Sequence, residues 1–443
     1  MSTRLTSARA RGVAVGAAAA VSLLAVTSAS AGAAGQPESG IRNVIPITEI
    51  LSYGQKVTAV AVEYAADVNP RTLDLDTFTV SDSLYNFRFN PIADLTDPAK
   101  RGDRTVTAIY TNDTPSLEPD QQSDRGRYVI IELDPMDPGG STVIAWNGGV
   151  KVNPDLQTRV VQNADVRAQA GNGQGNGPLL AKASATELTP TQPAVNLLYD
   201  DFTFERFMTA SGTDVPYAFW VPEDYDPAQQ YPVVVILPGQ GQGLLPNAAG
   251  EDNEGVQVAS DIPATAWLQE EWTGTDEDVI VLAVQNRRVG SATQQSELMV
   301  ELVTWFTGQY SIDPDRIYAS TVSYGSTLAW AALTNHPGLF DGVLLTGGFA
   351  ASQAQADAIA ASGTPVWITH GTGDHLLRVT TTGQASFNRI WNAYMALGKT
   401  PAQATALVKY TEYPLAAFYE PDQHLAAAPT YEDSSILRWL LAQ

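Results

Sequence analysis

The stretch that decides the fold covers residues 316–334 and reads RIYASTVSYGSTLAWAALT. Its first part, Arg316 to Ser320, has the β-branched and aromatic residues of a strand, and its last part, Thr327 to Thr334, has the composition of a helix. A sharp turn between a strand and a helix lifts a side chain above the edge of the sheet and points the amino end of the helix at it. The TVSYG segment in between therefore makes Ser323 a candidate nucleophile.

On both sides of this stretch, strand-like runs alternate with helical sequence. Leu298, Leu302, Trp305 and Phe306, for example, recur at helical spacing. The other strand-like runs are residues 217–221, 232–237, 278–284, 342–345, 365–369 and 408–413. Such alternation predicts right-handed crossovers and a mostly parallel sheet flanked by helices, which we assign to a catalytic domain at residues 196–443.

One of these runs ends in a loop that presents an acid. Val366 to Asp374 reads VWITHGTGD, an apolar strand followed by a glycine-flanked loop. Functional groups of open α/β sheets collect at the carboxyl ends of the strands. We therefore expect Asp374 to be the acid that orients a catalytic base.

The chain has only four histidines from which that base can come. His336 lies in a helix stop signal, and His370 and His375 flank the acid so closely that we expect them to be packing or loop residues. His424 lies between the last strand-like run and the last helix, and it completes the order Ser, Asp, His of the α/β-hydrolase fold. The sequence thus predicts a triad in which an imidazole of fixed tautomer activates the Ser323 hydroxyl.

A glycine-containing turn follows the apolar run 232–237. It reads Leu237 to Gly241, LPGQG, and its position fits the loop that supplies half of an oxyanion hole in this fold. The backbone N–H of Gln240 is the expected donor there, and the N–H of Tyr324, next to the nucleophile, is the expected second donor.

The first third of the chain has a different pattern. Short strand-like runs at residues 56–64, 105–110, 127–133, 142–146 and 158–162 are separated by Asp-Pro, Pro-Gly and Asn-Gly-Gly clusters. This spacing predicts an immunoglobulin-like β-sandwich over residues 41–168. We read the Gly-, Asn- and Thr-rich residues 169–195 as a linker.

Targeting and charge bear on where the chain acts. Residues 1–31 have three arginines, an apolar stretch and a small-residue site, as in a signal peptide, so we expect a secreted, extracellular protein. The net charge of −23 disfavours nucleic-acid and membrane-surface partners. The chain has no cysteine, which excludes disulfides and thiolate catalysis, and it shows no metal-ligand motif. We expect no cofactor and no metal, and the sequence does not specify an oligomeric state.

Three blocks of the sequence resemble a known family. Residues 217–222 (YAFWVP), 231–239 (YPVVVILPG) and 312–318 (IDPDRIY) look like segments of bacterial esterases related to polyhydroxybutyrate depolymerases and feruloyl esterases. Residues 45–64 look like the start of the immunoglobulin-like domain of the two-domain members. The resemblance implies a triad at Ser323, Asp374 and His424 and an oxyanion hole at Gln240 and Tyr324. The chain differs from the family in having Pro-Gly before the oxyanion loop, where His-Gly is usual, and Thr321 where Gly is usual.

Three functions fit these observations. The first is an extracellular carboxylesterase or polyester depolymerase acting on a small-molecule or polymeric ester. The second is a serine peptidase of the prolyl-oligopeptidase type, which has the same triad order but a propeller in place of a sandwich. The third is a non-catalytic binding protein on a hydrolase fold. For the first, we expect four aromatic residues to line the substrate pocket: Trp367, Phe349, Phe418 and Tyr419.

Overall fold

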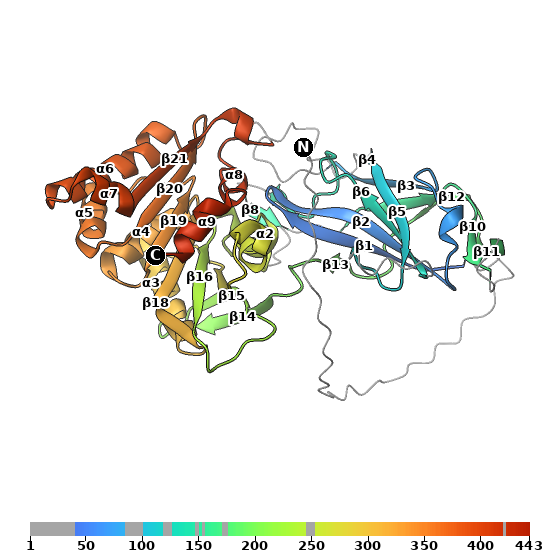
Figure 1. The fold of residues 1–443 in the computed structure, drawn as a ribbon, viewed down its shortest axis with the longest axis horizontal. Coiled ribbons are helices and arrows are strands. Elements are labelled where there is room, and N and C mark those ends of the chain that lie inside the picture. Colours follow the sequence, from blue (N-terminus) through green and yellow to red (C-terminus); the bar gives the residue numbers. More distant parts are fainter. Residues whose placement is uncertain are drawn as a thin grey trace.

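The computed structural model describes residues 40–84, 101–117, 126–146, 150–152, 156–170, 176–244, 253–419 and 422–443, which form two lobes (Figure 1). The expected signal peptide, residues 1–31, lies outside the described residues. No helix within the described ranges combines the length and apolarity needed to cross a bilayer.

The amino-terminal lobe is a sandwich of two main sheets. One sheet has the order β13-β1-β2-β6-β5 and the other the order β12-β9-β3-β4. The strands of this lobe are β1 (Ile41–Leu51), β2 (Gly54–Tyr64), β3 (Phe78–Ser83), β4 (Arg101–Arg104), β5 (Val106–Asn112), β6 (Tyr128–Leu133), β9 (Arg159–Gln162), β10 (Val166–Gln169), β11 (Asn176–Ala181), β12 (Ser184–Leu188) and β13 (Val195–Asn196), and the 3₁₀ turn η1 (Pro70–Thr72) follows β2. Strands β7 (Ile144–Trp146) and β8 (Val150–Val152) pair as a separate hairpin, and β8 lies against the second lobe.

The core of the sandwich follows from the two-residue period of its strands. Val60 and Val62 of β2 point inward and pack against Val80 of β3 and Val160 of β9. The intervening Ala59 and Ala61 belong to a smaller apolar cluster on the outer face of the first sheet. All five strand-like runs expected here are strands in the structure.

Residues 169–195 are not the linker that we expected. Strand β12 pairs with β9 of the sandwich, β11 pairs with β10, and β13 runs parallel to β1. The composition of this stretch is typical of a linker, but edge strands of a sandwich need only one buried face and tolerate polar sequence. The sandwich therefore extends to the start of the second lobe.

The second lobe is built on an eight-stranded sheet with the order β14-β15-β17-β16-β18-β19-β20-β21. The strands are β14 (Thr203–Met208), β15 (Asp214–Trp220), β16 (Tyr231–Leu237), β17 (Ile280–Val284), β18 (Ile312–Val322), β19 (Gly342–Thr346), β20 (Val366–Gly371) and β21 (Val408–Tyr413). Strands β14 and β15 are antiparallel to their neighbours, and the remaining pairs are parallel. Every strand-like run predicted in this half is confirmed, whereas β14 was not predicted.

Helices cover both faces of this sheet (Figure 1). The helices are α1 (Val256–Ala259), α2 (Glu270–Thr273), α3 (Ala292–Thr307), α4 (Gly325–Asn335), α5 (Gln353–Ser362), α6 (Gly383–Ala396), α7 (Pro401–Leu407), α8 (Ala427–Tyr431) and α9 (Ser434–Leu441), with the 3₁₀ turns η5 (Gln240–Gln242), η6 (Ala266–Leu268), η7 (Val379–Thr381) and η8 (Leu415–Ala417). Residues of α3 to α7 share one apolar core with the sheet, and residues of α1, α8 and α9 share another.

Strand β16 shows why the sequence requires this layered arrangement. Its seven residues are all buried, and it lies between β17 and β18 in the middle of the sheet. Val233, Val235 and Leu237 face the core under α3 to α7, while Val234 and Ile236 face the core under α9. A continuous apolar run is what a parallel strand covered on both faces needs.

Candidate active site

Ser323 lies at the sharp turn between β18 and α4. Its φ is +50°, in the left-handed region that non-glycine residues rarely adopt. Two hydrogen bonds hold the turn: the Ser323 N–H donates to the carbonyl of Thr346 at 2.9 Å, and the Ser326 N–H donates to the carbonyl of Ser323 at 3.1 Å. The strained serine between strand and helix is the geometry that the sequence predicted for a nucleophile.

A glycine makes this turn possible. A Cβ built on Gly325 would lie 2.0 Å from the carbonyl oxygen of Leu237, so the first turn of α4 packs directly on the end of β16. Any side chain at position 325 would separate the helix from the strand. Gly325 is therefore required for close approach of two backbones.

His424 approaches Ser323 from the loop after β21. Its Nε2 lies 3.1 Å from the Ser323 Oγ, and its Nδ1 lies 2.8 Å from the Asp374 Oδ2. Since the carboxylate accepts a hydrogen bond from the Nδ1–H, the Nε2 lone pair is left facing the serine hydroxyl. The expected proximity of the serine and histidine side chains is confirmed.

Asp374 is 4% exposed and follows the end of β20. Its Oδ1 accepts the backbone N–H groups of Leu376 and Leu377, both at 2.8 Å. Burial on its own raises the pKa of Asp374, but hydrogen bonds from His370 and His424 outweigh burial and hold the pKa well below its usual range. The group is thus a carboxylate at neutral pH, as an acid that orients an imidazole must be.

The expected oxyanion loop lies beside the nucleophile. A Cβ built on Gly239 would lie 3.6 Å from the Cβ of Ser323. Gln240 follows Gly239 as the first residue of η5, and Tyr324 immediately precedes α4. The structure therefore brings the backbones of both expected donors next to Ser323.

Gln242 is a residue that the sequence analysis missed. Its buried amide oxygen accepts the N–H of Gly239 at 2.7 Å, and its amide nitrogen donates to Asp261 at 3.1 Å. These bonds fix the turn that carries Gln240. No sequence signal showed that Gln242 holds this turn, because its partner Asp261 lies in a different segment of the chain.

Phe349 is the one expected pocket residue whose contacts lie at the turn itself. Its ring lies 6.3 Å from the Tyr324 ring in an edge-on arrangement, and its N–H donates to the Ser326 hydroxyl at 2.8 Å. Phe349 is 38% exposed, and its part in a substrate pocket stays a prediction.

Trp367 does not lie at this site, which corrects our expectation. Its indole packs edge-on against Trp439 of α9 at 5.2 Å, and the Lys409 ammonium lies 4.4 Å from the ring centre. Its N–H donates to Thr411 at 3.0 Å. Trp367 is the second residue of β20, at the end of the strand away from Asp374, and it packs in the layer under α9, so its role is in packing.

Phe418 and Tyr419 lie in the segment between η8 and His424. The Phe418 ring packs against Tyr413 at 6.5 Å, and the half-exposed Tyr419 packs against Tyr53 of the sandwich lobe at 5.3 Å. Their part in a substrate pocket stays a prediction.

The other histidines occupy different environments. His336 follows α4 and bonds Glu297 at the surface, and His375 is half exposed, with Asp422 3.4 Å from its Nδ1. These positions agree with structural or loop roles. His370 differs, because it is completely buried and its Nε2 lies 3.1 Å from the carboxylate of Asp374.

Thr321, at the position where glycine is usual, is fully buried in β18. It pairs in register with Leu237 of β16 and Leu345 of β19. Its hydroxyl has no hydrogen-bond partner. The threonine is therefore accommodated as a strand residue two positions before the turn, and the turn keeps its geometry.

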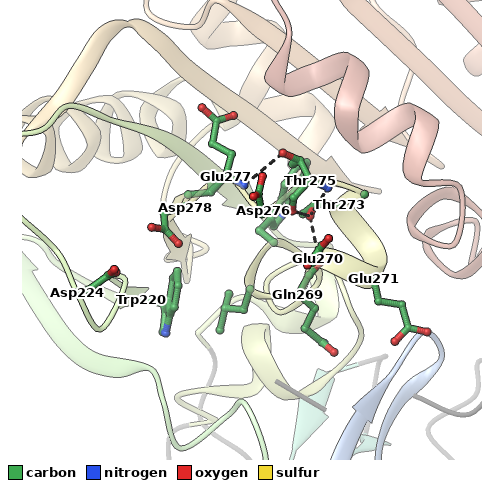
Figure 2. Close-up of a pocket in the computed structure, with 14 residues that line it drawn as sticks. Trp220, Asp224, Gln269, Glu270, Glu271, Thr273, Thr275, Asp276, Glu277 and Asp278 are labelled. Atoms are coloured by element: carbon green, nitrogen blue, oxygen red, sulfur yellow. Dashed lines mark hydrogen bonds between the residues drawn. The ribbon is translucent and has the colours of Figure 1, made fainter. Parts of the chain in front are cut away.

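A separate hollow of about 970 Å³ lies at the other end of β17, where that strand begins. Figure 2 shows the carboxyl groups of Asp224 and Asp278 beside the Trp220 ring. Burial, followed by the charges of Asp224, Asp276 and Glu277, raises the pKa of Asp278. Since Ser323 follows the carboxyl end of β18, this acidic hollow is not part of the serine site.

Comparisons with known proteins agree with this two-part architecture. A family model described as the esterase Ig-like N-terminal domain matches residues 43–174. The crystal structure of a thermostable esterase is similar with a TM-score of 0.72 and 24% identity, over 91% of this chain and 99% of that chain. No curated protein matches the chain.

Two further solved structures are similar to about half of this chain. A feruloyl esterase module from Clostridium thermocellum has 16% identity and a TM-score of 0.37, over 52% of this chain and 86% of that one. An esterase from Thermogutta terrifontis has 14% identity and a TM-score of 0.34, over 49% of this chain and 84% of that one. With the family model and the full-length match, the fold is an α/β-hydrolase fold preceded by an immunoglobulin-like β-sandwich, as the sequence predicted.

Proposed function

We propose that this chain hydrolyses carboxylic esters by forming an acyl-enzyme on Ser323. The observation that carries the proposal is the unbroken series of hydrogen bonds from the Ser323 hydroxyl through His424 to the buried Asp374. A serine hydroxyl is a weak nucleophile at neutral pH, and an adjacent imidazole held by a carboxylate is the arrangement that activates it. The esterase-type amino-terminal domain supports the choice of esters.

The chemistry proceeds in two halves. Ser323 Oγ attacks the ester carbonyl carbon while His424 Nε2 takes its proton, and the imidazolium then protonates the leaving alkoxide as the C–O bond breaks. Water attacks the acyl group in the same way, which releases the acid and regenerates the serine. The N–H groups of Gln240 and Tyr324 bind the oxyanion, and each such donor is worth about 3–4 kcal/mol in the transition state.

The substrate and the location of the protein belong to the same proposal. The signal-like residues 1–31 favour an exported enzyme that acts on esters outside the cell. The partly exposed Phe349 beside Tyr324 favours an acyl or aryl group at the mouth of the site, from a small molecule or from a polymer.

A fluorophosphonate probe tests the nucleophile directly. We expect intact-mass analysis to show one adduct on the wild type and none on Ser323→Ala, which should remain folded by circular dichroism. Ester turnover in the variant should fall by about 10⁴- to 10⁶-fold. Full activity in Ser323→Ala would show that the nucleophile lies elsewhere.

A substrate panel separates esters from amides. We expect p-nitrophenyl esters of graded acyl length to be turned over and peptide amides to be inert. Cleavage of the amides would favour a serine peptidase instead, although the sandwich lobe offers no propeller to enclose a peptide. A wild type that neither forms an adduct nor turns over any ester would indicate a non-catalytic binding protein.

A further inference from the structure

A second imidazole contacts the candidate catalytic acid. His370, near the end of β20, is completely buried, and its Nε2 lies 3.1 Å from the Asp374 Oδ2 and 2.8 Å from the carbonyl oxygen of Leu377. The same Oδ2 receives the Nδ1–H of His424 at 2.8 Å. One carboxylate oxygen is thus shared by two histidines.

We propose that His370 is a positioning residue that fixes the orientation of Asp374 and, through it, the tautomer and angle of His424. The inference rests on the proposed function, because it assigns a role within the same site. The two N–H groups of Leu376 and Leu377 fix only the Oδ1 atom of Asp374. On the Oδ2 side, His370 adds a second donor besides His424 itself, and this donor resists rotation of the carboxylate about the anchored oxygen.

The surroundings of His370 determine which nitrogen carries its proton. Nε2 faces two acceptors, the Asp374 carboxylate and the Leu377 carbonyl, so it must be the donor. Nδ1 is buried without any hydrogen-bond partner. A proton on Nδ1 would find no acceptor, and this asymmetry selects the Nε2–H tautomer.

Gly383, the first residue of α6, packs against the Nδ1 side of the His370 ring. A Cβ built on Gly383 would lie 2.8 Å from the Nδ1 of His370 and 3.1 Å from its Cβ. The amino end of α6 therefore lies on the Nδ1 side of the ring. From β21, Glu412 pairs in register with His370, but its exposed carboxylate bonds the hydroxyl of Tyr410.

A purely apolar role would not produce this arrangement. Burying an imidazole that only fills space leaves two polar nitrogens without partners, which destabilises the folded state. Here one nitrogen has two acceptors, and one of these belongs to the triad. The geometry therefore points to a role in the reaction, which a test must separate from packing.

The test compares four full-length variants. His370→Leu removes the donor, and His370→Gln replaces it with an amide that can reach the same oxygen. Gly383→Ala keeps the imidazole, but the added methyl would displace the ring away from α6. His336→Leu removes an exposed histidine elsewhere and serves as the matched control. The measurements are kcat and KM on a p-nitrophenyl ester, the pH profile of kcat/KM, thermal unfolding, and NMR of the chain labelled with ¹⁵N-histidine.

We expect His370→Leu to lower kcat by about 10- to 100-fold at nearly constant KM, as a misoriented catalytic group does. Because a carboxylate that has lost this donor no longer holds His424 in the same way, the pH profile of kcat/KM should differ from that of the wild type. His370→Gln should recover kcat to within about tenfold of the wild type. Gly383→Ala should lower kcat as well, and His336→Leu should match the wild type.

The NMR measurement does not depend on turnover. The wild type should show an Nε2–H tautomer for His370, and the Nδ1 proton signal of His424 should shift in His370→Leu and in Gly383→Ala. If His370→Leu does not fold, the kcat and the His424 signal of Gly383→Ala and His370→Gln are compared with those of the wild type instead.

Two failures can be told apart. A wild type without ester turnover but with the expected NMR shifts would reject the proposed function and keep the positioning role of His370. An active wild type would overturn the inference if the folded His370→Leu kept kcat within twofold, an unchanged pH profile and an unmoved His424 signal. An Nδ1–H tautomer for His370 would overturn it as well.

Discussion

The backbone of Ser323 is held in an unfavourable conformation that typically costs about 1–3 kcal/mol. The surrounding structure fixes this conformation through the Thr346 carbonyl on β19 and through the close packing of α4 on β16. In this conformation the Ser323 hydroxyl lies 3.1 Å from His424 Nε2, which is the contact that the proposed reaction needs.

Gly325→Ala tests this packing. The added methyl would lie 2.0 Å from the Leu237 carbonyl oxygen, so helix and strand must separate. We expect a lower melting temperature together with a loss of kcat of at least about tenfold, because Ser323 and the Tyr324 N–H move with the helix. Gly338→Ala, at a position with no atom nearby, is a control for glycine removal as such, although its φ of +88° adds backbone strain.

Asp374→Asn tests the carboxylate. The amide keeps the shape of the side chain but no longer forces the proton of His424 onto Nδ1, and in comparable triads this change lowers kcat by about 10⁴-fold. We expect a similar loss on p-nitrophenyl esters, with fluorophosphonate labelling of Ser323 slowed in parallel. Labelling at the wild-type rate would show that Asp374 does not orient the base.

The same substitution has an effect on stability that depends on pH. Because the folded-state pKa of Asp374 lies below its ordinary value of 3.8, the carboxylate stabilises the folded chain above that pH, and this stabilisation is lost as pH falls through the folded-state pKa. The melting temperature of Asp374→Asn should therefore lie below that of the wild type at pH 7, with a gap that narrows below about pH 4. A gap independent of pH would argue for a steric cause.

Among the elements, β17 has polar groups at both of its ends within the eight-stranded sheet. Its carboxyl end leads into Gln285, whose amide donates to the carbonyls of Gln242 and Asn253 beside the oxyanion loop. At its amino end, the strand follows Asp278, which lines the acidic hollow shown in Figure 2. The strand thus separates a region where charge repulsion accumulates from the region where the reaction is proposed to occur.

Asp278→Asn is expected to stabilise the protein. Burial and three neighbouring carboxylates raise the folded-state pKa of Asp278, so its ionisation at neutral pH costs folding free energy. The gain in melting temperature should be present at pH 7, should shrink as pH falls toward the ordinary carboxyl range near 3.8, and should decrease with added salt. Destabilisation at pH 7 would show that Asp278 has a favourable partner.

In the whole molecule, the sandwich lobe contacts the segments on both sides of His424. Tyr53, in the turn between β1 and β2, packs on Tyr419, and the Ser52 hydroxyl donates to Glu432 at 2.7 Å. Ile50 at the end of β1 belongs to the same apolar core as residues of α9. The two lobes therefore share a core next to the loop that carries the candidate base.

Tyr53→Ala tests whether this contact steadies the loop. An aromatic pair contributes about 0.5–1.5 kcal/mol beyond its buried area, so the melting temperature should fall, and kcat/KM should fall by a few fold as His424 becomes less well held. Tyr53→Phe keeps the ring and loses only the hydroxyl, which donates to the Pro135 carbonyl. If both variants had equal effects, the hydroxyl rather than the ring contact would be responsible.

Much of this architecture could be read from short stretches of sequence. The apolar run of β16 required burial on both faces, and the turn at Ser323 required a strand before it and a helix after it. The order Ser323, Asp374, His424 was sufficient to group three residues, because the ends of parallel strands meet at one edge of a sheet. These features depend on patterns a few residues long or on rules that hold for the whole fold class.

Other features depend on which elements come to lie against each other. The composition of residues 169–195 gave no sign that β12 would pair with β9, and nothing local showed that Trp367 would pack under α9. His370 was set aside because it is near Asp374 in the chain, yet the turn after β20 brings its Nε2 back to the carboxylate. Local patterns encode periodicity and turn chemistry, whereas the partners of a buried polar side chain are chosen by long-range packing, and so the residues that support the triad emerged only from the folded chain.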